Sequence, residues 1–173
     1  MGKNEYFVLD KKNLRETFMD YFQALEIPVI DYLAIGVQDT VNQKSTSLMS
    51  NAEWQKTFKD LNFAPYDPIR KVALNSKTTV FSFDDVSHQD LMGSEVMRQR
   101  KKHQIENGLV LMHRNLGQNF MMTLGTGFKN FQSHRFFLDY QKSVYRIFND
   151  LICLVSPLCE DFKPIKDLNV DAR

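Results

Sequence analysis

The feature of the sequence that most constrains its fold is a long apolar stripe in its last quarter. Between Ser133 and Val155, apolar residues recur at the spacing of one helix face. They are Phe136, Phe137, Tyr140, Val144, Ile147, Leu151 and Leu154. Pro157 ends the pattern. A helix with a single apolar stripe has to pack on another layer, so the rest of the chain must supply an apolar surface for it.

Helical and strand patterns alternate in the sequence before this stripe. Helices are predicted from Asp10 to before Pro28, from Ser50 or Asn51 to Leu61, from Asp67 onward, and over residues 94–107. Branched and aromatic residues predict strands at 30–37, 78–83, 109–113 and 119–124, and the last two form a hairpin. The polar residues 39–50 are expected to form a loop, and Gly108 to end its helix in the left-handed conformation.

This order of elements favours a sheet with helices packed on it. The hairpin strands LVLMH and NFMMTL do not alternate cleanly between polar and apolar residues, which indicates that both faces of the sheet are covered. The predicted fold is therefore α+β, a three-layer α–β–α sandwich with a mostly antiparallel central sheet.

Composition narrows the class of protein. The chain is 43% hydrophobic, with 14 Phe and 8 Met, which suits a globular domain with an irregular core or an apolar pocket. Its net charge of +1 argues against binding nucleic acid by overall charge. No apolar run reaches the roughly 18 residues of a membrane span, so no membrane partner is expected. Cys153 and Cys159 are expected to be reduced core thiols of a cytoplasmic protein.

The most informative stretch for function runs from Trp54 to Phe83. Phe58 lies one helical turn after Trp54 and therefore on the same face. An indole N–H only donates hydrogen bonds and a carboxylate only accepts them, so Trp54 and Asp67 could grip a ligand that offers one carbonyl and one N–H. Asp67 followed by Pro68 is also an ordinary helix start, with Asp67 as the N-cap. The sequence leaves both interpretations open.

Other candidate sites have weaker signals. A basic cluster (Arg98, Arg100, Lys101, Lys102 and His103) is either a phosphate or nucleic-acid site or a solvated helix face. The absence of interleaved aromatic residues favours the solvated face. The four histidines have no metal-ligand spacing, and no nucleophile or phosphate-loop motif is present. No metal, no cofactor and no enzymatic activity are therefore expected.

With these residues placed, the chain resembles the N-terminal signal-binding domain of LuxR-type quorum-sensing regulators. That family has Trp, then Tyr one helical turn later, then Asp-Pro, a second Trp, and Gly at the head of a hairpin. The matching residues here are Trp54, Phe58, Asp67-Pro68, Phe83 and Gly108. The resemblance extends from about Leu14 to Leu154 and implies the same α–β–α sandwich.

The resemblance implies roles for individual residues. Trp54 would donate to the lactone carbonyl of an N-acyl homoserine lactone, and Asp67 would accept from the ligand amide. Thr123 would bond the acyl-amide carbonyl. Phe58 and Phe83 would be pocket walls, Ser50 stands where the family often has a Tyr, and Pro68 and Gly108 would be structural.

Two departures from the family pattern reduce the number of polar groups that could bind the ligand. Phe58 replaces the Tyr and Phe83 the second Trp, so one hydroxyl donor and one indole are lost. The expected organisation is a ligand-sensing domain over residues 1–156 and a tail over 157–173, without the helix-turn-helix domain through which such regulators bind DNA. The expected function is to sense an N-acyl homoserine lactone or a similar amphipathic signal for transcription regulation, as a homodimer. The alternative is a ligand-free interaction or dimerisation domain of the same fold.

Overall fold

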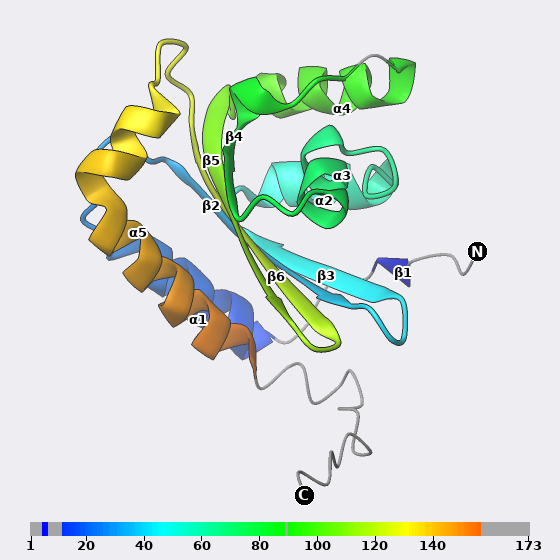
Figure 1. Ribbon diagram of the computed structural model, residues 1–173, viewed down its shortest axis with the longest axis horizontal. Helices are drawn as coiled ribbons and strands as arrows, with labels where there is room; N and C mark the ends of the chain where they lie inside the picture. The colour runs from blue at the N-terminus through cyan, green and yellow to red at the C-terminus, as the bar shows by residue number, and fades with distance from the viewer. Residues whose placement is uncertain (1–4, 7–11, 89, 157–173) are drawn as a thin grey trace, which may run out of the picture.

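The computed structural model describes residues 5–6, 12–88 and 90–156 of the chain. A six-stranded sheet lies between two layers of helices (Figure 1), with the strand order β1-β3-β2-β6-β5-β4. One layer holds α1 (Lys12–Gln23) and α5 (Ser133–Val155). The other holds α2 (Ala52–Asp60), α3 (Pro68–Asn75) and α4 (Leu91–Lys102). The predicted three-layer α+β sandwich is confirmed.

The sheet is antiparallel except at one edge. All neighbouring strands run antiparallel apart from β1, which pairs in parallel with β3. The strands are β1 (Glu5–Tyr6), β2 (Tyr32–Asp39), β3 (Lys44–Met49), β4 (Val80–Ser82), β5 (Asn107–Asn115) and β6 (Gln118–Thr126). A tight turn joins β5 and β6 as the predicted hairpin, and Gly117 takes the positive φ of 79° that this turn requires.

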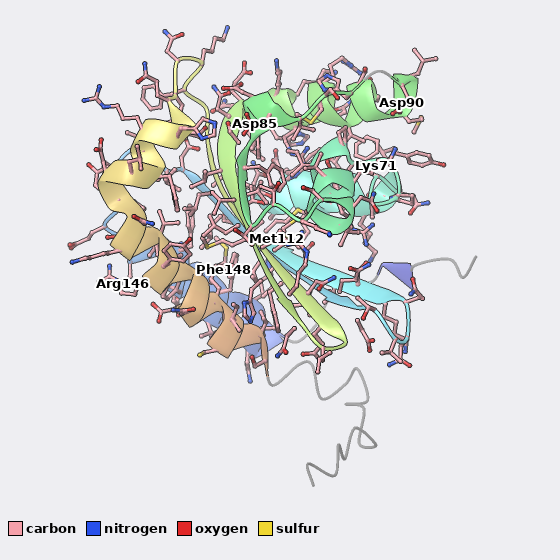
Figure 2. All side chains as sticks on the ribbon, in the orientation of Figure 1. Lys71, Asp85, Asp90, Met112, Arg146 and Phe148 are labelled. Carbon is pink, nitrogen blue, oxygen red and sulfur yellow. The ribbon has the colours of Figure 1, made fainter. Side chains whose placement is uncertain are left out.

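The two faces of the sheet bury different kinds of side chain. Toward α1 and α5, alternate residues such as Leu33, Ile35 and Val37 form a continuous aliphatic and aromatic core. Phe148 of α5 points into this layer and Arg146 points away from it (Figure 2). The apolar stripe that predicted α5 packs into this layer through Phe136, Val144, Ile147 and Leu151. Tyr140 is 37% exposed and its backbone is not helical (φ −119°, ψ 20°), so its place on the buried stripe was wrong. Toward α2, α3 and α4 the sheet carries smaller and more polar residues, and this face contributes to the pocket described below.

The prediction of a loop at residues 39–50 was wrong, because β3 lies there. β3 pairs with β2 over its whole length and has β1 on its other side. Its sequence, KSTSLM, has no alternation of apolar residues, so the pattern favours a loop over a strand. Ser45 and Ser47 face the pocket rather than a hydrophobic core, so the strand does not need apolar residues there.

The boundaries of α4 also differ from the prediction. The helix begins earlier, because the Asp90 side chain accepts a hydrogen bond from the backbone N–H of Gly93, 2.6 Å away, and caps it. It ends earlier as well, and the left-handed residue after it is Gln104, with φ of 60°. Gly108 lies inside β5 instead of ending the helix.

Some expectations concern the C-terminal part of the chain. Cys153 is exposed on α5, so the prediction of a core thiol was wrong for this residue: the buried stripe passes through Leu151 and Val155 instead. Cys159 and the tail at 157–173 lie outside the described residues. Among the residues that the structure describes, no helix is both long and apolar enough to cross a bilayer.

We expect Gly108→Ala to destabilise the fold, since an added Cβ would lie 2.7 Å from the Leu124 carbonyl oxygen and 2.8 Å from the Phe83 ring. Such overpacking costs about 1–3 kcal/mol of unfolding free energy, measurable by urea denaturation. Gly36→Ala is the matched control, because a Cβ there meets its nearest atoms at 3.8 Å. Equal losses in the two variants would contradict a steric role for Gly108.

Candidate ligand-binding site

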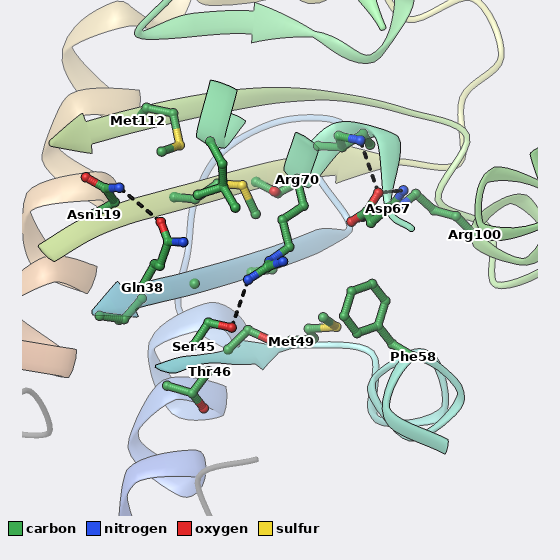
Figure 3. Close-up of a pocket in the computed structure, with 18 of the residues that line it drawn as sticks. Gln38, Ser45, Thr46, Met49, Phe58, Asp67, Arg70, Arg100, Met112 and Asn119 are labelled. Atoms are coloured by element: carbon green, nitrogen blue, oxygen red, sulfur yellow. Dashed lines mark hydrogen bonds and ion pairs between the residues drawn. The ribbon is translucent and has the colours of Figure 1, made fainter. Parts of the chain in front are cut away.

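A pocket lies between the sheet and the layer formed by α2, α3 and α4 (Figure 3). The space inside it, counted to its open mouth, is about 670 Å³. That figure includes open solvent at the mouth, so the enclosed cavity is smaller than it. Its lining residues are Tyr32, Ala34, Gly36, Val37, Gln38, Ser45, Thr46, Ser47, Met49, Phe58, Asp67, Ile69, Arg70, Leu74, Arg100, Met112, Asn119, Met121 and Thr123.

The sheet builds the floor of the pocket from alternate residues of neighbouring strands. Ala34 on β2 lies opposite Met49 of β3 and Thr123 of β6, so these side chains share one face. Gly36 leaves room in the middle of this floor. Farther along the same strands the floor becomes polar, where Asn119 donates to the Gln38 side chain over 3.0 Å.

Helix α3 forms the opposite wall, and Asp67 sets where that helix begins. The Asp67 carboxylate accepts a hydrogen bond from the Ile69 backbone N–H at 3.1 Å, and Pro68 occupies the first turn. The helix-start interpretation of Asp67-Pro68 is therefore confirmed. Arg70, which follows Ile69 in α3, reaches across the pocket and donates to the Ser45 hydroxyl over 2.8 Å (Figure 3). Its other terminal nitrogen donates to the Ala64 carbonyl over 3.1 Å.

Asp67 also forms a buried ion pair with Arg100 of α4. The two terminal nitrogens of Arg100 donate to the two carboxylate oxygens, at 3.0 and 2.9 Å. Exposed fractions are 2% for Asp67 and 6% for Arg100. Burial by itself would lower the pKa of Arg100, but the charge and hydrogen bonds of Asp67, helped by Tyr32, raise it above its ordinary value. Both groups line the pocket as a charged, mutually satisfied pair.

Trp54 lies beneath this ion pair rather than in the pocket wall. It is fully buried, and the Arg100 Cζ lies 5.2 Å from its ring centroid, in a cation–π contact. The same Arg100 Cζ lies 5.6 Å from the centroid of the Phe83 ring. Among the described residues, none is a hydrogen-bond partner of the Trp54 indole N–H. The guanidinium of Arg100 thus contacts both the indole ring and the carboxylate.

The remaining candidate residues divide into two groups. Phe58 and Thr123 line the pocket, the first from α2 and the second from β6. Phe83 packs on Arg100 and against Gly108, outside the pocket lining. Ser50 also lies outside it, and its hydroxyl accepts from the Leu33 backbone N–H over 2.9 Å. Ser50 thus links the end of β3 to β2.

Sequence reasoning missed the two arginines of the pocket. Arg98, Lys101 and Lys102 are exposed, as expected for a solvated face, but Arg100 is buried, so that interpretation was wrong for this residue. One signal was available: Arg100 follows the buried Val96 by one helical turn and therefore shares its inward face. Nothing in the pattern around Arg70 distinguishes it from a surface residue of α3. In the part of the chain that the structure describes, no three His, Cys, Asp or Glu side chains are grouped to hold a metal ion.

Comparison with known protein families identifies the family of the chain. Residues 14–141 match the model of the autoinducer binding domain family. The chain belongs to this family. Among curated proteins, none matches the sequence.

Solved structures of LuxR-type regulators share the fold of this autoinducer-binding domain. The N-acylhomoserine lactone-dependent LuxR-family transcription factor CepR2 from Burkholderia cenocepacia is 10% identical, with a TM-score of 0.60, over 84% of this chain and 95% of that one. SdiA in complex with octanoyl-rac-glycerol is 14% identical, with a TM-score of 0.55, over 87% and 68% of the two chains. The ligand-binding domain of VqsR from Pseudomonas aeruginosa is 15% identical, with a TM-score of 0.54, over 82% and 85%.

Asp67→Asn separates the two structural roles of Asp67. As an N-cap, Asn is nearly as good as Asp. As the partner of Arg100, Asn leaves a buried guanidinium without its counter-charge, which costs about 3–5 kcal/mol of unfolding free energy. We expect the larger loss in chemical denaturation. Asp90→Asn, at the exposed cap of α4, is the control and should cost only a few tenths of a kcal/mol. If both variants lose equally little, the ion pair contributes nothing to stability.

Proposed function

We propose that this autoinducer-binding domain binds an N-acyl homoserine lactone or a similar amphipathic small molecule in the pocket between its sheet and α2, α3 and α4. Binding, and not turnover, is the expected activity. The sensing domain would comprise residues up to 156. Its output would be transcription regulation, with DNA contacted through a helix-turn-helix domain.

The observation that carries the proposal is the composition of the pocket wall. Most of its large side chains are flexible or aromatic, among them Met49, Phe58, Met112 and Met121, and these can pack along an acyl chain. Its polar side chains include the Asp67–Arg100 pair, Arg70 with Ser45, and Gln38 with Asn119. A pocket that combines apolar walls with placed polar groups is typical of sites for amphipathic ligands.

We also propose that the domain works in the cytoplasm as a homodimer. The support for a dimer is the outward side of α5, where Leu138, Tyr140 and Tyr145 are 73%, 37% and 42% exposed. Sedimentation analysis with and without ligand tests this point. A monomer under both conditions would contradict it.

Ligand binding should raise the melting temperature. A ligand that binds only the folded state stabilises it by about 2.7 kcal/mol at roughly a hundred times its Kd. For a domain of this size that corresponds to a Tm increase of roughly 5–10 °C in scanning calorimetry. The panel should contain lactones of several acyl lengths and monoacylglycerols, since SdiA has been solved with octanoyl-rac-glycerol. The alternative, a ligand-free interaction domain, predicts no shift with any compound.

Filling the pocket floor should abolish binding without harming the fold. Gly36→Val adds a branched side chain where nothing lies closer than 3.8 Å to the first added carbon. Valine also suits a strand better than glycine. We expect the Tm of the ligand-free variant to stay the same or rise and the ligand-induced shift to disappear. Gly36→Ala should retain part of the shift. A full shift in the valine variant would place the ligand elsewhere.

A further inference from the structure

The chemistry of the pocket wall differs from the clamp that the family resemblance implies. That clamp needs an indole donor and a free carboxylate acceptor facing one ligand. Here the guanidinium of Arg100 contacts both Trp54 and Asp67, at 5.2 Å from the indole centroid and in two hydrogen bonds to the carboxylate. Trp54 is absent from the pocket lining and Arg100 is part of it. Asp67 lines the pocket as well, so the group presented to a ligand at this end is an ion pair whose Arg100 keeps N–H groups beyond those bound to Asp67.

Arg100 is held in this position by several independent contacts. Asp67 binds it in a fork, the rings of Trp54 and Phe83 contact its Cζ, and the Met97 sulfur accepts from it at 3.2 Å. Moving Arg100 aside to admit a lactone ring would leave the Asp67 carboxylate buried without its counter-charge. A cost of that kind is large compared with the free energy of one ligand hydrogen bond.

The donors and acceptors left over at this end are unequal. Asp67 already accepts three hydrogen bonds, one from Ile69 and two from Arg100. Arg100 donates three, and a guanidinium has more N–H groups than that. Arg70 lines the pocket too, and it donates to the Ala64 carbonyl and the Ser45 hydroxyl. At the Asp67 end, a ligand amide N–H thus meets a carboxylate that already accepts three hydrogen bonds, whereas a ligand oxygen meets the remaining N–H groups of Arg100.

We infer that the pocket selects an amphipathic carboxylate, such as a medium-chain fatty acid or an N-acyl amino acid, with its carboxylate on Arg100 and its chain along the methionines. Guanidinium groups match carboxylates in geometry and form charge-assisted hydrogen bonds with them. The inference rests on the proposed function, because it names the ligand class of the same pocket.

The test uses four compounds with one acyl chain: N-octanoyl homoserine lactone, its ring-opened carboxylate N-octanoyl homoserine, octanoic acid, and octanoyl glycerol. Affinities are measured by calorimetry on the full chain. We expect the two carboxylates to bind about tenfold or more tighter than the lactone and the glycerol ester, since charge-assisted hydrogen bonds exceed neutral ones by this margin. A preference for the lactone or the ester overturns the inference and leaves the proposed function standing. Binding of none of the four compounds overturns both.

Variants locate the carboxylate. The double variant Asp67→Asn with Arg100→Met removes both charges of the pair together, so that no lone buried charge remains. It should lose the preference for carboxylates while keeping affinity for the ester. Arg98→Met is the matched control, because Arg98 is an exposed arginine of the same helix paired with Glu95. A carboxylate preference that persists in the double variant, or is lost equally in the control, overturns the role of Arg100.

Discussion

The buried ion pair between Asp67 and Arg100 organises the helical layer over the pocket. It joins the first residue before α3 to the last turn of α4, although the two are 33 positions apart in the sequence. Trp54 from α2 and Phe83 from the end of β4 pack on the same guanidinium. Charges this deeply buried are tolerated only when they are paired and hydrogen-bonded. Their positions therefore constrain how the helices on this side of the sheet can be placed.

The two faces of the sheet consequently have separate roles. The face under α1 and α5 is packed with aliphatic and aromatic residues in one continuous cluster. The face under α2, α3 and α4 combines a second apolar cluster with an open space, and its strands carry glycine, serine and threonine where the pocket floor lies. A cavity removes packing contacts, so the stability it forgoes has to come from the opposite layer.

The sequence predicts an element well when its local pattern of apolar residues shows which face is buried, and poorly when burial depends on distant parts of the chain. The stripe of α5 and the hairpin were predicted well, because hydrophobic periodicity records which face is buried. β3 was missed because Ser45 and Ser47 face a cavity, and a polar strand over a pocket has the composition of a loop. Among the pocket residues, Asp67 was singled out from its own chemistry and again by the family resemblance, whereas the pocket roles of Phe58 and Thr123 came from the resemblance. Arg100 was missed because only the tertiary structure brings Asp67 to it, and a charged residue is read as exposed until its partner is known.

The same pair explains why the helical layer can be ordered before a ligand arrives. In a clamp made of an indole and a carboxylate alone, the ligand itself would satisfy the carboxylate, and the empty pocket would bury it with the cap hydrogen bond from Ile69 as its one partner. Arg100 supplies the counter-charge within the chain, so that cost does not arise. The ligand then adds to a structure that is already satisfied. Because Arg100 touches residues of α2, α3 and the segment after β4, a ligand on its free N–H groups would act on all of these elements through a single side chain.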